Sequence, residues 1–314
     1  MFQQVQIQHY IKRCKMNFGK MKWLCQSAMV IGTLCLSTIV SLQSPVKSNN
    51  SPSAQVPVTR TSTPFQSKSV IYVNSATGAD SEVSGKSEDT PYRTITYALD
   101  KAQPGTVIQI ASGSYTSASG EVFPLVIKPD VSLRGDESSK GLNTVITGGG
   151  RHISPTFARQ DVAVLVEKDC TITGVTITNP NTRGTALWIE YGSPTIKNNT
   201  FTNSNREGIF ITATAAPTIE ANVFTKNSGN GISVARSAKG EIRNNVFQET
   251  GFGLAISGTS SPLVIDNQII QNRVGIIISE EARPVIHYNF FKNNQQGDVI
   301  IATGSQAQPE LGTN

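Results

Sequence analysis

Asparagine recurs at a fixed interval through the second half of this 314-residue chain. The recurring residues are spaced 23, 23, 22 and 22 apart, and they are Asn199, Asn222, Asn245, Asn267 and Asn289. A glycine followed by alternating apolar residues, as in Gly231-Ile-Ser-Val, precedes each of the last four. A self-similar unit of this length indicates a solenoid, in which each turn packs only against its neighbours.

The residue types select the kind of solenoid. Between Gly184 and Gln296 the chain has only three leucines, so a leucine-rich repeat does not fit. The alternating apolar positions are instead β-branched or Phe, and turn residues separate them too closely for a helix. We therefore predict an all-β fold, a single-stranded, right-handed parallel β-helix over residues 70–304. We expect about seven or eight coils, followed by a tail at 305–314.

The repeated asparagines are predicted to be structural. Each side-chain amide is expected to bond the amide on the next coil, and asparagine tolerates the left-handed backbone of a tight turn. We interpret all five as one ladder along the rod.

The first half of the chain predicts a cap for the rod. Thr90-Pro91 is a typical helix start, and apolar residues follow at helical spacing up to Ala102. We expect one short N-terminal capping helix over the first strand, placed at 106–110, and a loop at 148–155. The sequence leaves three alternatives for the C-terminal end of the rod: the tail caps it, it self-associates with another chain, or the rod is cut short there.

The net charge of +5 comes from the N-terminal segment. From residue 45 onward 22 basic and 22 acidic residues cancel, so the body does not indicate a nucleic-acid partner. Basic residues precede an uncharged apolar stretch at 23–42, the order found in export signals. We expect residues 1–44 to be a signal peptide or an uncleaved anchor, the sole membrane contact, and 45–69 to be a Pro/Ser/Thr-rich linker. The expected location is the periplasm, the cell surface or the medium.

Metal-binding patterns are weak in this sequence. His152 and His287 lie far apart in the repeat, and Cys170, the single cysteine after the leader, is expected as a small buried apolar residue. We therefore predict no metal site from ligand spacing.

Several N-terminal segments resemble a known family. These are Ile71-Tyr-Val-Asn-Ser-Ala-Thr-Gly-Ala-Asp80, Thr90-Pro-Tyr-Arg-Thr-Ile95, Lys101-Ala-Gln-Pro-Gly-Thr-Val-Ile-Gln-Ile110 and Val131-Ser-Leu-Arg-Gly-Asp136. They are similar to the first coils of bacterial secreted β-helix proteins of the pectate-lyase-like superfamily, and more narrowly to a family known only as a domain of unknown function. The resemblance spans about 70–314 and implies either enzymes of acidic polysaccharides or non-catalytic surface proteins. The repeat also resembles the generic one of periplasmic copper-maturation proteins, without matching metal ligands.

Enzymes of this superfamily need converging charged groups. A lyase uses an Arg or Lys base with Ca²⁺ held by several carboxylates, and a hydrolase uses two or three carboxylates around one bond. The best adjacent set for catalysis is Glu167, Asp169 and Glu190 on neighbouring coils, and Arg206 is a further catalytic candidate. The acidic column is interrupted, because later coils place Thr212, Arg236 or Gly258 at that position.

A second set of residues is predicted to bind a ligand without catalysing a reaction. Arg183, Arg206 and Glu207 stand just before successive repeat glycines, and Trp188 and Tyr191 offer aromatic faces for sugar rings. Counting from Gly184 turns Trp188 outward, whereas counting back from Pro194 turns it inward, so its direction stays open.

Two functions follow from these observations. The favoured one is an exported, non-catalytic β-helix that binds or organises cell-surface or extracellular polysaccharide. The alternative is a lyase or hydrolase of a uronate-containing glycan, with Ca²⁺ required only for the lyase.

Overall fold

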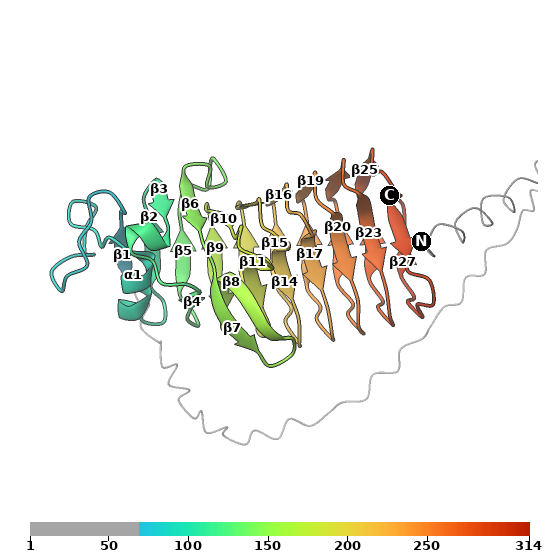
Figure 1. Ribbon diagram of the computed structural model, residues 1–314, viewed down its shortest axis with the longest axis horizontal. Coiled ribbons are helices and arrows are strands. Elements are labelled where there is room, and N and C mark those ends of the chain that lie inside the picture. The colour runs from blue at the N-terminus through green and yellow to red at the C-terminus, as the bar shows by residue number, and fades with distance from the viewer. Residues whose placement is uncertain (1–68) are drawn as a thin grey trace, which may run out of the picture. The chain divides into compact units, whose positions relative to one another are not determined.

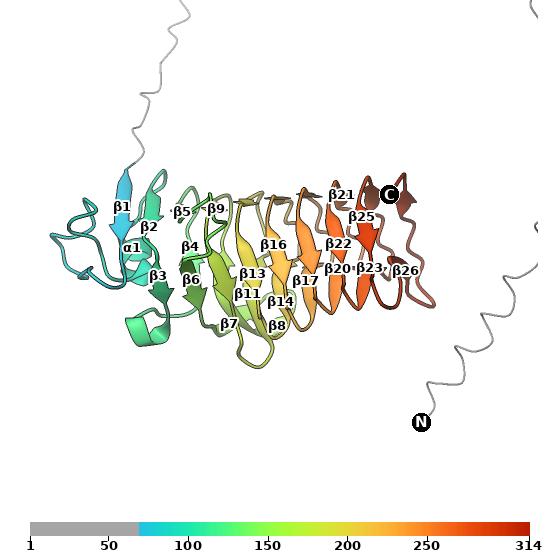
Figure 2. The same cartoon turned by 90° about the horizontal axis from the view of Figure 1, so that it is seen from above.

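The computed structural model describes residues 69–314, which form a rod of about nine turns of parallel β-helix (Figure 1, Figure 2). The predicted leader at 1–44 and the predicted linker, except for its last residue, lie outside the described residues. Each full turn contributes one strand to each of three parallel sheets, here called A, B and C. The predicted all-β parallel β-helix is confirmed, with about one turn more than the repeat suggested.

Sheet A runs the full length of the rod. Its strands are β1 (Val70–Val73), β2 (Val107–Ile110), β5 (Ser132–Arg134), β9 (Thr171–Thr173), β12 (Thr195–Lys197), β15 (Thr218–Glu220), β18 (Glu241–Arg243), β21 (Leu263–Ile265), β24 (Val285–His287) and β27 (Glu310–Leu311). From β5 to β24 the middle residue of each three-residue strand is buried, because alternate residues point to opposite faces of a sheet. Ile196, Ile219 and Ile242 stack in this inward column.

Sheet B carries an aromatic stack in the core. Its strands are β3 (Gly113–Tyr115), β6 (Thr144–Thr147), β10 (Thr176–Thr178), β13 (Thr200–Thr202), β16 (Val223–Thr225), β19 (Val246–Gln248), β22 (Gln268–Ile270) and β25 (Phe290–Lys292). The rings of Phe201, Phe224 and Phe247 follow one another at centroid distances of 5.0 and 4.7 Å. Gly231 lies in the strand that follows Phe224 along the chain. It packs against this stack, because a Cβ on Gly231 would come within 2.6 Å of the Phe247 ring.

Sheet C has the longest strands and positions the candidate site. Its strands are β4 (Leu125–Ile127), β8 (Ala158–Val166), β11 (Gly184–Ile189), β14 (Glu207–Ile211), β17 (Asn230–Val234), β20 (Phe252–Ile256), β23 (Val274–Ile278) and β26 (Val299–Ile301). In β14, Ile209 and Ile211 belong to the core of the rod, whereas Phe210 belongs to a separate cluster on the outer face. A further strand, β7 (Gly150–Ser154), pairs antiparallel with the first half of β8.

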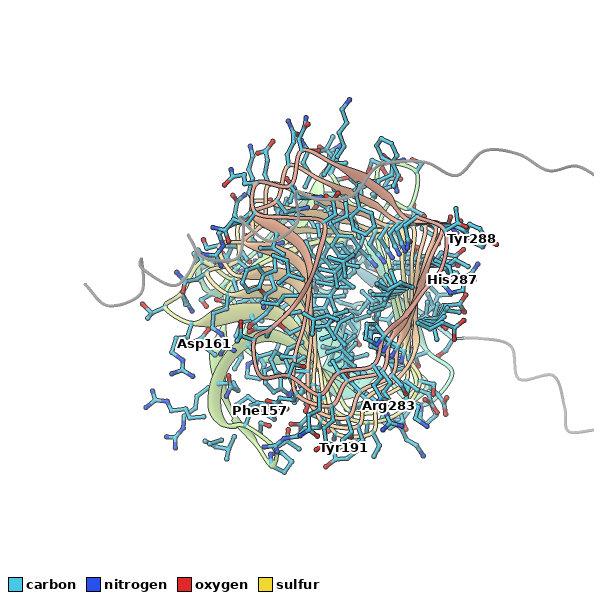
Figure 3. All side chains as sticks on the ribbon, turned by 90° about the vertical axis from the view of Figure 1, so that its right-hand side faces the viewer. Phe157, Asp161, Tyr191, Arg283, His287 and Tyr288 are labelled. Atoms are coloured by element: carbon cyan, nitrogen blue, oxygen red, sulfur yellow. The ribbon has the colours of Figure 1, made fainter. Side chains whose placement is uncertain are left out.

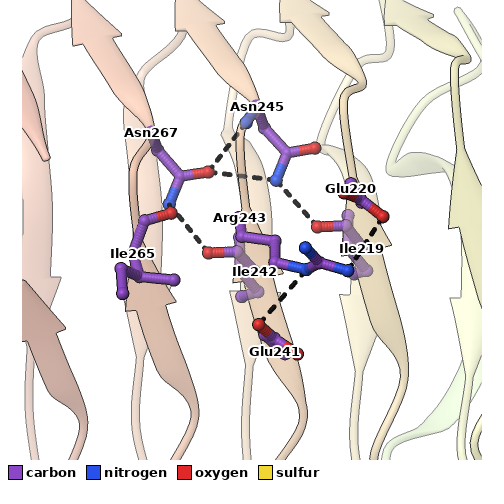
Figure 4. Close-up of polar contacts among 8 residues, drawn as sticks. All are labelled: Ile219, Glu220, Glu241, Ile242, Arg243, Asn245, Ile265 and Asn267. Atoms are coloured by element: carbon purple, nitrogen blue, oxygen red, sulfur yellow. Dashed lines mark hydrogen bonds and ion pairs between the residues drawn. The ribbon is translucent and has the colours of Figure 1, made fainter. Parts of the chain in front are cut away.

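The turn between sheets A and B holds the asparagine ladder (Figure 4). Asn245 Oδ1 accepts hydrogen bonds from the backbone N–H and the Nδ2 of Asn222, at 2.9 and 3.0 Å. Asn245 Nδ2 donates to the Ile219 carbonyl and to Asn267 Oδ1, at 2.9 and 3.0 Å. The left-handed backbone falls on the residue before each ladder asparagine, with φ of 55° at Asn244, so the ladder residues themselves do not need it.

A second ladder occupies the turn between sheets B and C. Its members are Asn179, Ser204, Asn227, Thr250, Asn272 and Asn294, spaced 25, 23, 23, 22 and 22 residues apart. A backbone N–H bonds the next side chain at each step except that from Asn227 to Thr250. The backbone N–H of Ser204 donates to Asn227 Oδ1 at 3.0 Å, and that of Thr250 donates to Asn272 Oδ1 at 3.0 Å. The sequence conceals this ladder because its residue types vary from coil to coil.

The N-terminal end of the rod carries the expected short helix, α1 (Ile95–Lys101), while the 3-10 helix η1 (Ser117–Ser119) follows β3. The N-cap of the helix is Thr94, four residues later than the expected Thr90, because Tyr92 still bridges to Val73 of sheet A. The Glu121 carboxylate accepts hydrogen bonds from the first amides of the helix. The first strand of sheet A is β1 rather than the expected strand at 106–110.

Stacking continues past residue 304, into the segment predicted as a tail. Strand β27 pairs with β24, and Asn314 Oδ1 accepts from the backbone N–H of Asn289 at 3.1 Å. No helix within residues 69–314 is long and apolar enough to cross a membrane.

Candidate functional site

A β-hairpin projects from sheet C where residues 148–155 were expected to form a loop (Figure 1). Its register pairs Arg151 with Asp161, His152 with Gln160 and Ile153 with Arg159. Alternation exposes Arg151, Ile153 and Arg159, and it turns the half-buried His152 and the buried Gln160 toward the rod. The loop prediction is therefore wrong, because these residues alternate as a strand does.

A notch opens beside this hairpin. Its cavity has a volume of about 430 Å³ and is lined by Arg151, Arg159, Gln160, Asp161, Thr182 and Arg183. We call these six residues the basic notch. The first four come from the hairpin, and the last two come from the turn that leads into β11.

Positive charge predominates in the basic notch. Within residues 69–314, none of the three arginines forms an ion pair. The one carboxylate, Asp161, accepts hydrogen bonds from Asn179 Nδ2 at 2.9 Å and Asn181 Nδ2 at 3.3 Å. Three guanidinium groups are thus left to attract an anion from solvent.

Arg206 and Glu207 are linked to the notch through its lining residue Gln160. Arg206 Nη1 donates to Gln160 Oε1 at 2.9 Å, and its Nη2 pairs with Glu207 Oε1 at 3.0 Å. Glu207 is buried, and that burial raises the pKa of its carboxyl despite the opposing effects of Arg206 and the Thr185 hydroxyl. Of the set predicted to bind a ligand, Arg183 therefore lines the notch. Arg206 bonds to the lining residue Gln160, and Glu207 bonds to Arg206.

Trp188 points outward from sheet C but is not exposed. The indole stacks on Phe210 at 4.3 Å with 4° between the ring planes, and the Phe157 ring packs edge-on against both. Residues of the hairpin cover the indole, so its accessible surface is 0%. Tyr191 is 45% exposed, and Figure 3 places it apart from Asp161 when the rod is viewed end-on.

The predicted catalytic carboxylates lie in different surroundings. Glu167 and Asp169 are exposed, and Asp169 lines a different cavity of about 530 Å³ together with Asp130 and Cys170. Glu190 is 5% exposed and accepts hydrogen bonds from the hydroxyls of Ser154 and Thr156 under the hairpin.

Within residues 69–314 no group of three or more His, Cys, Asp or Glu side chains is placed to hold a metal ion. The Cys170 thiol is buried, which raises its pKa to about 12, and it is therefore a poor nucleophile.

Five residues of the notch were missed from sequence, namely Arg151, Arg159, Gln160, Asp161 and Thr182. The usable signal is the order Ala158-Arg-Gln-Asp-Val162, which continues the alternating pattern of β8 back toward residue 158. Read as a strand, that order places Arg159 and Asp161 on one face and predicts a partner strand just before it.

Residues 76–314 match the family described as "Protein of unknown function (DUF1565)". The chain belongs to this family. Among curated proteins, none matches this DUF1565 chain.

Three solved structures have similar folds. The complex of XylC with xylose is 11% identical, with a TM-score of 0.49, and the match covers 71% of this chain and 66% of that one. The pectin methylesterase from carrot is 14% identical, with a TM-score of 0.48 and coverage of 74% and 88%. A rhamnogalacturonan lyase is 12% identical, with a TM-score of 0.40 and coverage of 77% and 86%. At such identities the function of the DUF1565 chain must be argued from its own residues.

Proposed function

We propose that this chain is an exported β-helix protein that binds acidic polysaccharide in the basic notch without cleaving it. The observation that carries the proposal is the group of three arginines around a cavity of about 430 Å³, none of them in an ion pair within residues 69–314. Guanidinium groups bind carboxylate and sulfate oxygens through paired N–H donors. A polymer fits this surface better than a small metabolite does, because the notch opens along the side of a rod.

The bonding partners of the carboxylates support binding rather than catalysis. Glu190 and Asp169 have no bonding partner in common, and Glu207 is engaged by Arg206 and Thr185. A glycosidase needs two carboxyl groups facing one bond across roughly 5–10 Å of open space. The basic notch offers only Asp161, which is held by two asparagine amides.

Export is part of this proposal. The basic and apolar order of residues 12–42 is that of an export signal, and polysaccharides of this kind lie outside the cytoplasm. Cleavage of the leader would release the rod, and retention would leave it attached to the membrane.

The test uses the full chain with acidic and neutral polymers. Polygalacturonate, alginate and dextran sulfate are compared with dextran by affinity electrophoresis. The proposal predicts retardation by at least one acidic polymer, weakening as salt is raised, and none by dextran.

Catalysis is tested in the same samples, incubated with and without Ca²⁺. Unsaturated products or new reducing ends would contradict the non-catalytic part of the proposal. No retardation by any acidic polymer would contradict the binding part.

A further inference from the structure

Asp161 is the one acidic residue that lines the basic notch, and only one of its carboxylate oxygens is engaged. Oδ1 accepts hydrogen bonds from Asn179 Nδ2 at 2.9 Å and from Asn181 Nδ2 at 3.3 Å. This oxygen also lies against Gly149, where an added Cβ would be 2.1 Å from it. Oδ2 accepts no hydrogen bond and forms no ion pair within residues 69–314. Because Asp161 lines the cavity, Oδ2 is left to accept from a molecule bound there.

The arginine opposite Asp161 in the hairpin does not neutralise this carboxylate. Arg151 of β7 and Asp161 of β8 are direct cross-strand partners, a position at which opposite charges can pair. No ion pair joins them, and both side chains line the cavity of about 430 Å³. The guanidinium and the free carboxylate oxygen are therefore both available to different atoms of one ligand.

These two kinds of group define the chemistry of the ligand. Guanidinium groups supply donors and positive charge, so they require an anionic acceptor. An ionised carboxylate is an acceptor only, so it requires a donor. A uronate residue with free hydroxyls carries both on one sugar ring. A polymer whose hydroxyls are esterified brings only acceptors near Asp161, and anionic acceptors are repelled by its charge.

We propose that Asp161 determines the specificity of the basic notch: Oδ2 accepts a hydrogen bond from a free hydroxyl of the sugar whose carboxylate is bound by the arginines. The inference rests on the proposed function and narrows it to acidic polysaccharides that keep free hydroxyls beside the acidic group. The negative charge of Asp161 weakens the binding of any anion. The hydrogen bond offsets this repulsion only where the ligand supplies a hydroxyl donor.

The test compares one polymer with and without its free hydroxyls, using the full chain. Polygalacturonate or alginate, whichever the wild type retains more strongly, is measured beside the same polymer after O-acetylation. Acetylation keeps the carboxylates and blocks the hydroxyl donors. The wild type is expected to bind the unmodified polymer at least about tenfold more tightly, because acetylation removes a hydrogen bond to a charged acceptor.

Asp161→Asn tests the residue itself. The amide oxygen of the new side chain is expected to stay with the two asparagine donors, so its NH₂ group takes the place of Oδ2 and cannot accept. This variant is expected to bind the two forms of the polymer with affinities within about threefold of each other. Asp266→Asn is the matched control, because Asp266 is exposed in a turn between sheets A and B and its side chain makes no hydrogen bond or ion pair within residues 69–314. It makes the same change in net charge and should keep the preference of the wild type.

The outcomes separate this inference from the proposed function. Equal affinity of the wild type for the two forms overturns the role of Asp161, whether or not the variant folds, and leaves binding in the notch in place. A preference that persists in Asp161→Asn overturns it too, because the hydroxyls are then recognised elsewhere. Retention of dextran sulfate alone has the same consequence. Retention of no acidic polymer overturns the proposed function, and the inference with it.

Discussion

Arg206 bridges two parts of the molecule that are distant in sequence: Nη1 bonds Gln160 of the hairpin at 2.9 Å, while Nη2 pairs with Glu207 at 3.0 Å. A single guanidinium therefore compensates a buried carboxylate and holds the hairpin that carries most of the basic notch. Binding by the notch and folding of β14 depend on the same side chain.

Removing this guanidinium should destabilise the fold mainly through Glu207. In Arg206→Met a nearly buried carboxylate loses its partner, and we expect a loss of about 1–3 kcal/mol in the free energy of unfolding. Adding Glu207→Gln to Arg206→Met should recover most of the lost free energy of unfolding at pH 7. Burial raises the pKa of Glu207, so its contribution to stability is present below the unfolded pKa and is lost as pH rises through the folded one. Urea unfolding measures both variants, and a double variant no more stable than Arg206→Met would refute this explanation.

A substitution at the centre of the asparagine ladder between sheets A and B should destabilise the fold. Asn245→Ala removes four hydrogen bonds and leaves buried amides of neighbouring coils unpaired, so we expect a loss of about 2–4 kcal/mol. Asn143 is exposed, and its side chain makes no hydrogen bond within residues 69–314, so Asn143→Ala is the matched control. Similar melting temperatures for the two variants would argue against a structural ladder.

The periodicity of the sequence predicts the coil, the inward residues and the first ladder, because those features repeat at a fixed interval. The second ladder escapes the same reasoning, since Ser204, Asn227 and Thr250 share a position but not a residue type. The hairpin is an insertion in one coil, and a feature that occurs once has no register to be compared with. This is why Arg183 could be singled out and its notch partners Arg151 and Arg159 could not.

The direction of Trp188 illustrates the same limit. Its pairing with Phe210 in sheet C shows that the count from Gly184 was the correct one. Full burial of an outward residue depends on the covering hairpin, whose Phe157 lies more than 30 residues earlier in the chain. No local pattern around Trp188 contains that information.

Acid should destabilise the hairpin through His152. Burial lowers the pKa of this imidazole, against the opposing charge of Glu190. A lowered folded pKa means that its contribution to stability is complete above the unfolded value near 6.5 and is lost as pH falls through the folded value. Stability of the wild type should therefore fall more steeply between pH 7 and 5 than that of His152→Gln, which keeps His287. Parallel pH profiles from thermal melts would show that the pKa of His152 is the same in the folded and unfolded chains, which would contradict its lowering by burial.

The charge of the basic notch is tested most directly by one pair of substitutions in the full chain. Arg183 lines the notch, whereas Arg283 lies at another corner of the rod (Figure 3), and neither forms an ion pair within residues 69–314. The dissociation constant for the acidic polysaccharide that the wild type binds is measured for Arg183→Gln and Arg283→Gln at one salt concentration. We expect Arg183→Gln to weaken binding by about tenfold and Arg283→Gln to leave it within about twofold. Equal affinities of the two variants would contradict binding in the notch.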